Sequence, residues 1–400
     1  MKIFFLTISW PPKGKRNLYS DLIDEFIQNG HKVTVVTSQE RRTAKPSSFE
    51  DENGIQVLRI KAGNISKTNP LEKSISLLLL GWQLKRGINK HLADEEFDLI
   101  LFNTPPITLS GLINFLKDKY QSSVYLLLKD IWPYGFVDFG LIKRGGWIYN
   151  YFRKHEKKLY ELSDFIGCMS PKGVEFVNKL YPNLSNTTVE VCPNSAKLPN
   201  GAPHKTSEND NIRDKFGIPE DATVFIFSGN IALGHGIDFL SNAVLNLRDY
   251  ESAFFLIGGA GTYFDRVKET LENENVSNAM VYSYLAQDEY EALVSICDVG
   301  LILLDHQYSY PQFPSRLLSY LQNRMAVLCA VNEETDIGEI VEEHGAGLEI
   351  RHGDNDGFTD AVKYLSENRQ EIQKMGKNAF ALLEGEYQTS HSYQTIIKHF

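Results

Sequence analysis

Short apolar runs alternate with longer amphipathic segments along most of this chain, and this alternation is the feature that most limits its fold. In the first half the apolar runs fall at residues 2–8, 32–38, 55–60, 98–103, 123–130 and 165–170. In the second half they fall at residues 223–230, 253–261, 281–285, 299–305, 326–331 and 346–350. Amphipathic segments lie between the runs, for example Leu18–Asn29, which is ended by Gly30. The pattern predicts an α/β protein in which crossover helices join parallel strands.

The two series of strands predict two domains, each a Rossmann-like unit. A chain of 400 residues is too long for one ordinary core. A stretch dense in Pro, Asn and Gly follows Pro193. We therefore expect an N-terminal domain over residues 1–197, a linker over 198–206 and a C-terminal domain over 207–380. The last helix, 381–400, is expected to pack back toward the N-terminal domain.

Charge and motif content exclude several classes of protein. The net charge of −10 argues against nucleic acid as a partner. Four scattered cysteines without a CxxC pair indicate buried thiols in a reducing cytoplasm. The chain has no HExxH or similarly spaced ligand pair and no GxSxG element, so neither a metal site nor a serine hydrolase is expected. The first apolar run is broken by Pro11–Pro12, which favours a buried strand over a signal peptide.

An arginine at the start of a predicted helix is the most specific sign of a binding site. Leu317, Leu318 and Leu321 repeat at helical spacing, so a helix is expected from about residue 315 to 323. Arg316 would then lie at the positive end of the helix dipole, where a cation is disfavoured. An anion held by Ser315, Arg316 and the helix N–H groups resolves the conflict. The alternative is a solvated arginine whose stem covers apolar surface.

Glycine turns follow two strands of the second half, at the edge where a parallel sheet binds ligands. Gly229 and Asn230 follow one strand, and Gly259 and Gly261 lie in the "GGAG" turn after the next. Such turns let the backbone approach a ligand closely, although they are also common structural features. "GGAG" is neither a GxGxxG fingerprint nor a P-loop. Together with the Pro-Ser-Arg helix start, the turns predict a site for a nucleotide diphosphate.

The strand ends of the first half carry a different set of residues. They include the Pro/Gly loop 9–17, "NTPP" at 103–106, and "KDIWPYG" at 129–135. These segments supply the candidate acceptor-binding residues Gly14, Lys15, Arg16, Asn103 and Trp132, and the candidate catalytic residues Lys129 and Asp130. A polar pair beside a flat aromatic ring suits carbohydrate. The alternatives are an exposed loop for the lysines and a core aromatic for the tryptophan.

Two segments indicate contact with an anionic membrane surface. Residues 143–162 combine Trp147, Tyr149, Tyr151 and Phe152 with six lysine and arginine side chains. Residues 76–90 join a leucine run to Trp82 and later cations. The alternative for 143–162 is an amphipathic crossover helix with solvated lysines. No apolar stretch is long enough to span a bilayer. We therefore expect a cytoplasmic protein that is peripheral on the inner face of the cell membrane.

At this point a family resemblance is evident. "MKIFFLTISWPP…NGHKVTVVTS", "DIWPYGFVDFG", "VCPN", "FSGNIALGHGID", "FLIGGAG" and "FPSRLLSYLQNRMAVLCAV" occur in this order over essentially the whole chain. Together they resemble the family 4 (group 1) glycosyltransferases of GT-B fold, and most closely the bacterial L-fucosamine transferases of surface-polysaccharide synthesis. The resemblance implies two Rossmann-like domains facing across a cleft. It also implies transfer of a sugar, with retention, from a nucleotide-sugar, usually UDP-linked, without a metal or other cofactor.

The resemblance also implies roles for individual residues. Ser315, Arg316 and Leu317 would hold the donor diphosphate, with Arg316 stabilising the leaving group. Gly229 and Asn230 would lie under the same phosphates. Tyr284 and Leu285 would contact the base.

Some positions depart from the family pattern. Pro311 and Ser319 occupy the places of two glutamates, of which the second normally holds the ribose; Ser319 would be a weaker substitute. Asn230 and His235 replace an arginine and a lysine, and Gly14–Lys15 replaces a Gly-Gly pair. These changes leave Arg316 as the main cation for the diphosphate.

Three functions remain open on the sequence. The first is a peripheral-membrane glycosyltransferase acting on a lipid-diphosphate-linked glycan, whose diphosphate would meet Lys13, Lys15 and Arg16. The second is a GT-B nucleotide-sugar epimerase, which would need positioned carboxylates that the strand-end loops largely lack, apart from Asp130. The third is a non-catalytic partner subunit of a glycosyltransferase.

Overall fold

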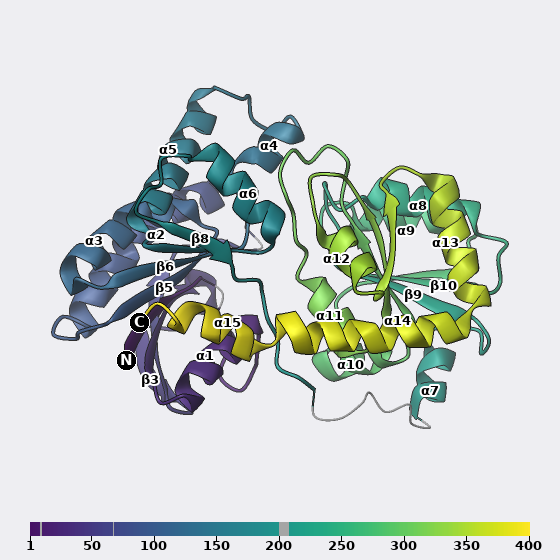
Figure 1. Cartoon of the computed structure of the whole chain (residues 1–400), viewed down its shortest axis with the longest axis horizontal. Coiled ribbons are helices and arrows are strands. Elements are labelled where there is room, and N and C mark those ends of the chain that lie inside the picture. Colours follow the sequence, from purple (N-terminus) through teal and green to yellow (C-terminus); the bar gives the residue numbers. More distant parts are fainter. Residues whose placement is uncertain (9, 67, 200–207) are drawn as a thin grey trace. The chain divides into compact units, whose positions relative to one another are not determined.

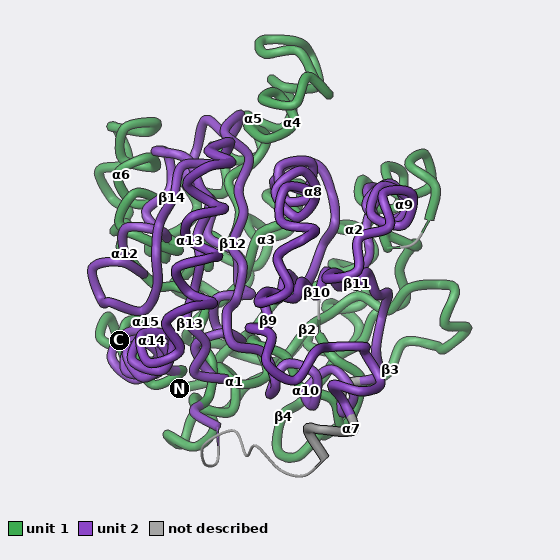
Figure 2. The backbone as a smooth tube through the Cα atoms, turned by 90° about the vertical axis from the view of Figure 1, so that its right-hand side faces the viewer, with its two compact units in different colours: residues 1–197, 389–400 green, residues 198–388 purple. Residues whose placement is uncertain are grey.

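The computed structural model describes residues 1–8, 10–66, 68–199 and 208–400, which form two compact units (Figures 1 and 2). Unit 1 comprises Met1–Lys197 and Thr389–Phe400, and unit 2 comprises Leu198–Gln388. From residue 200 onward, the linker expected at 198–206 lies outside the described residues. Residue 380, where the sequence placed the second boundary, lies inside a helix of unit 2.

Unit 1 contains an eight-stranded sheet in the order β3-β4-β2-β1-β5-β6-β7-β8. All neighbouring strands are parallel except β3 and β4, which are antiparallel. The strands are β1 (Lys2–Leu6), β2 (Lys32–Glu40), β3 (Ser48–Glu52), β4 (Ile55–Ala62), β5 (Leu99–Thr104), β6 (Ser123–Leu128), β7 (Phe165–Cys168) and β8 (Thr188–Val191). The sequence did not predict β3 or β8. Both are short edge strands, and the residues of β3 are mostly exposed and acidic, so neither has an apolar run.

Crossover helices connect these strands. They are α1 (Leu18–Gln28), α2 (Pro70–His91), α3 (Ser110–Tyr120), α4 (Tyr134–Asp138), α5 (Trp147–Leu162) and α6 (Pro171–Leu180), with short 3-10 turns η1 (Arg41–Thr43) and η2 (Ile107–Leu109). Asn17 caps α1, because its side chain accepts the N–H of Ser20 while the Ser20 hydroxyl accepts the N–H of Asn17.

The last helix, α15 (Thr389–Ile397), packs on α1 within unit 1. The ring of Tyr393 contacts Phe26 at 5.0 Å between centroids, and its hydroxyl lies 3.0 Å from Nε2 of His31. His31 follows the end of α1, so it joins the first crossover of the chain to its last helix.

Unit 2 contains a six-stranded, fully parallel sheet in the order β11-β10-β9-β12-β13-β14. Its strands are β9 (Thr223–Asn230), β10 (Ala253–Ala260), β11 (Ala279–Tyr282), β12 (Val299–Leu303), β13 (Ala326–Val331) and β14 (Gly347–Arg351). Its helices are α7 (Glu208–Lys215), α8 (Ile237–Asn246), α9 (Phe264–Asn273), α10 (Gln287–Ser295), α11 (Arg316–Gln322), α12 (Ile337–Glu343), α13 (Asn355–Glu367) and α14 (Arg369–Leu382), followed by the π-helical turn η3 (Leu383–Tyr387). The predicted α/β class with two parallel-sheet units is confirmed.

One side chain connects the two halves of the unit 2 sheet. Strand β12 pairs with β9 through Val299–Phe225 and Gly300–Ile226, and the fully buried hydroxyl of Tyr320 lies 3.2 Å from the carbonyl oxygens of both Ile226 and Leu301. The ring lies against Gly300, where an added Cβ would approach the Tyr320 ring to 2.3 Å. Helix α11 is therefore anchored where β9 and β12 meet.

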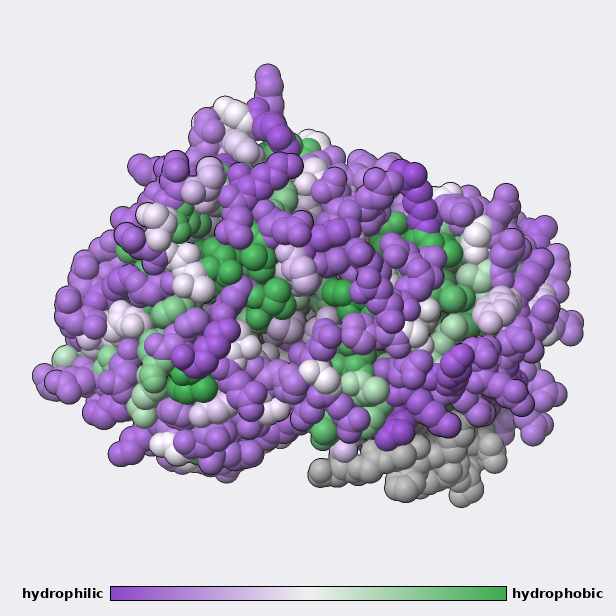
Figure 3. All heavy atoms as spheres, in the orientation of Figure 1, coloured by the Kyte–Doolittle hydropathy of each residue, from purple (hydrophilic) through white to green (hydrophobic). Residues whose placement is uncertain are grey.

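Hydrophilic residues cover most of the face drawn in Figure 3, and hydrophobic residues show in separate patches. Among the residues that the structure describes, no helix combines the length and the apolar composition that crossing a bilayer requires.

We predict that Tyr320→Phe lowers the stability of unit 2 by about 1–3 kcal/mol, because two buried carbonyl groups lose a hydrogen-bond donor. The measurement is urea unfolding followed by far-UV circular dichroism and by tryptophan fluorescence. All four tryptophans lie before residue 148, so fluorescence reports on unit 1. The circular-dichroism transition of unit 2 should move to lower urea while the fluorescence transition stays in place. Tyr364→Phe, at an exposed tyrosine of α13, is the control, and equal midpoints for both variants would contradict the role of Tyr320.

Candidate functional site

The carboxyl ends of β9 and β12 mark the ligand-binding position of the unit 2 sheet. The chain runs from β9 to β10 and β11 on one side, and then from β12 to β13 and β14 on the other. Ligands in open parallel sheets bind at such a switch point, outside the carboxyl ends of the strands.

The guanidinium of Arg316 lies at this switch point. It stacks over the Phe227 ring of β9 at 4.1 Å from the centroid, and a Cβ added to Gly229 would lie 3.4 Å from its Nη2. Its Nη1 is buried, with no hydrogen-bond partner in the described part of the chain. Burial lowers the pKa of Arg316. A buried N–H donor without an acceptor is costly, and an incoming anion would supply one.

Glycines let the backbones at the ends of β9 and β10 approach closely. Gly229 pairs with Gly259, and a Cβ on Gly259 would lie 1.8 Å from the Gly229 carbonyl oxygen. A Cβ on Gly261 would lie 2.1 Å from the carbonyl oxygen of Ile231 and 2.9 Å from Oδ1 of Asn230. The predicted glycine turns and Asn230 therefore lie together beside Arg316.

His235 lies in the loop that follows β9. Its Nδ1 is buried and has no hydrogen-bond partner within the described ranges. Burial, the larger cause, and the nearby positive charge of Arg316 together lower its pKa to about 4. His235 is therefore neutral at pH 7 and adds a dipole, not a charge, to the site.

The other residues expected at the diphosphate differ in their placement. Ser315 is exposed, and its side chain makes no capping hydrogen bond to α11. The Leu317 side chain is fully buried, and its N–H donates to the Pro314 carbonyl at 3.3 Å. Ser319 is half-buried, and its carbonyl accepts from Asn323. Helix α11 has seven residues and begins with Arg316.

Tyr284 and Leu285 lie at the edge of the sheet. The sequence placed a strand over 281–285, whereas β11 ends at Tyr282, so both residues fall in the segment that follows. Tyr284 is 87% exposed and Leu285 is half-buried. The aromatic face of Tyr284 is thus accessible to a planar ring.

Unit 1 has its own switch point, between β1 and β5. The predicted loop with Gly14 and Lys15 follows β1, and Asn103 lies near the end of β5, where its Oδ1 is buried without a described hydrogen-bond partner. A cavity of about 470 Å³ adjoins the end of β2, and its lining includes Trp10, Lys13 and Gln39. The cavity thus adjoins the loop after β1 through Trp10 and Lys13, whereas Gly14, Lys15 and Asn103 are not among its lining residues.

Arg16 is occupied by carboxylates of its own unit. Its Nη2 lies 2.6 Å from Oδ1 of Asp21 and 2.5 Å from Oδ2 of Asp24, and Lys197 contacts Asp24 at 2.9 Å. The charge of Arg16 is largely balanced here, whereas Lys13 and Lys15 are exposed.

Lys129 and Trp132 are held by their surroundings. Lys129 Nζ donates to the carbonyl oxygen of Cys192 at 3.0 Å, and burial lowers the Lys129 pKa to about 8. The half-buried Trp132 packs on Phe136 and Phe152 at 4.2 and 5.4 Å between centroids. Asp130, next to Lys129, is half-buried.

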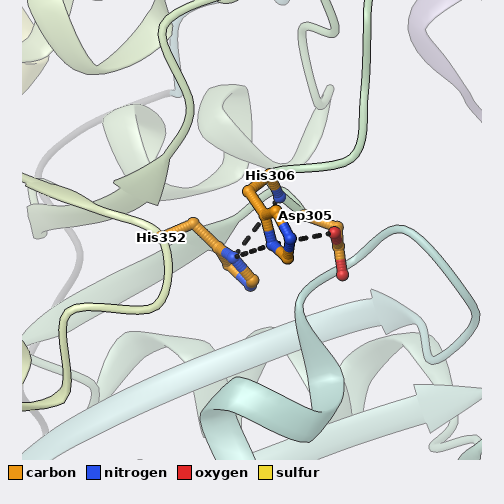
Figure 4. A group of neighbouring side chains, drawn as sticks. All are labelled: Asp305, His306 and His352. Atoms are coloured by element: carbon orange, nitrogen blue, oxygen red, sulfur yellow. Dashed lines mark hydrogen bonds and ion pairs between the residues drawn. The ribbon is translucent and has the colours of Figure 1, made fainter. Parts of the chain in front are cut away.

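Sequence reasoning missed Phe227, Tyr320 and a group formed by Asp305, His306 and His352 (Figure 4). His306 and His352 are 46 residues apart, so no short ligand motif reveals them. The signal was their position, because Asp305 and His306 follow one apolar run and His352 follows another.

Comparison with known proteins identifies the C-terminal part. Residues 208–381 match the family described as glycosyl transferases group 1, and the unit 2 site lies within the matched residues. The probable glycosyltransferase WbjE of Pseudomonas aeruginosa is 23% identical over 259 residues, which are 62% of this chain and 61% of WbjE. The match therefore spans less than two thirds of the length of WbjE.

Solved structures share the fold over the whole chain. The sucrose-phosphate synthase of Thermosynechococcus elongatus gives a TM-score of 0.74 at 13% identity, covering 100% of this chain and 98% of that one. HepE of Anabaena, solved with UDP-glucose, gives a TM-score of 0.69 at 16% identity. The match covers 100% of this chain and 99% of HepE.

We predict that Arg316→Met raises the pKa of His235 from about 4, because the variant removes a nearby positive charge. The pKa should stay below 6.5, since burial is the larger cause of the shift. The measurement is NMR titration of histidine Cε1–H signals, with His235→Gln assigning the resonance. Arg248→Met, at the opposite end of the sheet, should leave the signal unchanged. A wild-type His235 that titrates near 6.5 would contradict this geometry.

Proposed function

We propose that this chain is a retaining glycosyltransferase that moves a hexosyl or N-acetylhexosaminyl group from a UDP-sugar to a lipid-diphosphate-linked glycan. The observation that carries the proposal is the buried, unpartnered Nη1 of Arg316 at the switch point of a group 1 glycosyltransferase domain. The UDP complexes of HepE support a uridine nucleotide. The match to WbjE and the resemblance to L-fucosamine transferases support a role in bacterial surface-polysaccharide synthesis.

In this proposal Arg316 acts on the leaving diphosphate. Negative charge grows on the bridging oxygen as the glycosidic bond breaks, so a guanidinium with a free N–H stabilises the transition state more than the bound donor. Gly229 leaves room for the phosphate because it has no side chain.

A same-face route accounts for retention. The bond between the anomeric carbon and the diphosphate oxygen breaks, the acceptor hydroxyl bonds to the same face of that carbon, and its proton passes to a leaving phosphate oxygen. No protein nucleophile and no metal enters these steps. A glycosyl-enzyme adduct trapped and mapped by mass spectrometry would contradict the route.

We place the acceptor on unit 1. Exposed Lys13 and Lys15 would meet its diphosphate, Asn103 at the end of β5 would hydrogen-bond to an acceptor hydroxyl, and the half-buried Trp132 would border a sugar ring. Lys129 and Asp130 would orient the acceptor hydroxyl. Arg16 has a smaller role than the sequence suggested, because Asp21 and Asp24 balance its charge.

We assign membrane contact to the exposed face of α2. Five exposed apolar side chains form what we call the α2 stripe: Leu71, Ile75, Leu78, Leu79 and Trp82. The Trp82 side chain is 62% exposed. These positions lie on one helical face. Exposed Lys85 and Arg86 follow the stripe, which suits an anionic lipid surface on the cytoplasmic side of the cell membrane. On α5, by contrast, Phe152 packs on Trp132 and Arg153 pairs with Glu156, so less of that helix is available.

We predict that UDP stabilises the full chain against heat and that Arg316→Ala abolishes the effect. UDP at about one hundred times its dissociation constant should add about 2.7 kcal/mol to the free energy of unfolding. The measurement is differential scanning fluorimetry with a panel of nucleoside diphosphates, followed by UDP-sugars that include UDP-linked L-fucosamine derivatives.

Arg248→Ala is the matched control, because Arg248 is an exposed arginine of unit 2 that precedes β10. It should keep the wild-type UDP shift. The absence of any nucleotide effect in the wild type would overturn the proposal and favour a non-catalytic partner subunit.

We predict that Trp82→Glu weakens binding to vesicles containing phosphatidylglycerol by tenfold or more, because removing one large apolar side chain from the lipid interface costs about 1.5–3 kcal/mol. Co-sedimentation at low salt measures the binding. Trp147→Glu is the matched control on α5, where Trp147 is 81% exposed. Release by Trp147→Glu alone would assign docking to α5 instead, and a wild type that does not bind would overturn membrane contact.

A further inference from the structure

Three potential metal ligands converge at the carboxyl edge of the unit 2 sheet (Figure 4). Asp305 and His306 follow β12, and His352 follows β14, with β13 between the two strands. Ligand atoms of the three side chains all lie within 4.8 Å of one another. Residues far apart in sequence thus meet because parallel strands bring their ends to one edge.

The separations suit a tetrahedral ion. Nδ1 of His306 lies 3.4 Å from Nδ1 of His352 and 3.3 Å from Oδ1 of Asp305. An ion with four bonds of about 2.0–2.1 Å holds its ligand atoms about 3.3–3.4 Å apart. We propose that Asp305, His306 and His352 bind a divalent transition-metal ion of the zinc class, with a remaining position open to water.

The surroundings orient these side chains for that task. The backbone N–H of His306 donates to Nδ1 of His352 at 3.3 Å, so this ring nitrogen is the unprotonated one. Its single lone pair would turn to the ion, which would replace the N–H as its partner. The N–H of Gln307 donates to Oδ1 of Asp305 at 2.9 Å. The His352 ring packs on Phe239 at 4.9 Å between centroids. Hydrogen bonds and packing of this kind fix metal ligands in place.

Solvent can reach the group. The His306 side chain is 66% exposed and that of Asp305 is 18% exposed, so an ion can enter and keep a water ligand. A plain hydrogen bond between the two imidazoles is the competing arrangement, and it needs a proton on one Nδ1. Metal binding requires both nitrogens to be unprotonated, which separates the two arrangements experimentally.

The group is joined to the loop that carries His235. The N–H of Asp305 donates to the Gly234 carbonyl at 3.0 Å, and Nε2 of His352 would lie 2.9 Å from a Cβ on Gly236. A bound ion would therefore tighten residues 234–236 beside Arg316. From this we infer that the bound ion raises the affinity of the unit 2 site for a nucleotide. This inference rests on the proposed function, in which the site binds a UDP-sugar.

The first experiment uses the full chain and the metal alone. After treatment with a chelator, Zn²⁺ binding is measured by competition with a chromophoric chelator, and Co²⁺ is added to record its d–d absorption. Wild type should bind about one equivalent with a tetrahedral Co²⁺ spectrum. His306→Ala should weaken binding by a hundredfold or more, and because His306 is exposed this variant should fold.

His352→Ala and Asp305→Asn should also weaken binding. His344→Ala is the matched control, because His344 is a partly exposed histidine of unit 2 that pairs with Glu386 at 3.1 Å. It should bind Zn²⁺ as the wild type does. A wild type without micromolar Zn²⁺ affinity, or a His306→Ala variant with unchanged affinity, would overturn the site.

The second experiment tests separately whether the group binds Zn²⁺ and whether bound Zn²⁺ raises the affinity for UDP. UDP affinity is measured with and without Zn²⁺ in the wild type and in His306→Ala, and it should rise several-fold in the wild type alone. Zn²⁺ binding without a change in UDP affinity would overturn the link to the loop. Zn²⁺ binding by a protein that binds no UDP would instead overturn the proposed function and leave the metal site standing.

Discussion

The junction between β9 and β12 is the constraint on which the rest of unit 2 depends. The two strands pair through two residue pairs, and the Tyr320 hydroxyl bridges the carbonyl of Ile226, in the second pair, and that of Leu301, the next residue of β12. This hydrogen bond fixes α11 by its fifth residue from the amino end. With α11 fixed, its first residue, Arg316, is held over Phe227. A structural bond made by a core tyrosine thereby positions the cation to which we assign the chemistry.

The cations of the two units are held in opposite ways. In unit 1, Arg16 lies between Asp21 and Asp24, and Lys129 donates to the Cys192 carbonyl, so both have internal partners. In unit 2, Arg316 has an aromatic face and an unpartnered Nη1. Charge that is already balanced attracts an external anion weakly, whereas a donor without an acceptor gains most from one. The unit 2 site is therefore the better candidate for a phosphate.

Much of the fold follows from the sequence, because apolar runs with helices between them have few alternatives to parallel sheets. Gly229 was predicted because strand ends share one edge of the sheet, and Arg316 because a cation at the start of a helix favours a bound anion. Edge strand β3 escaped prediction because its acidic residues need no apolar run. His352 escaped because its partners are distant in sequence and because only the strand order brings β14 within reach of β12. The ion pairs of Arg16 with Asp21 and Asp24 depend on the direction of the side chains, which the hydrophobic periodicity of the sequence does not reveal.

The burial of Arg316 links stability to function in unit 2. A guanidinium that loses water and gains one aromatic face recovers about 2 kcal/mol, while each buried donor left unpaired costs about 1–3 kcal/mol. The unliganded site is therefore less stable than a satisfied core would be. An anion that accepts from Nη1 recovers this free energy, and it recovers more as the anion becomes more negative. In the function we propose, a leaving diphosphate is most negative when the glycosidic bond has broken. The same unpaired donor that weakens the unliganded protein would then favour the transition state over the bound donor.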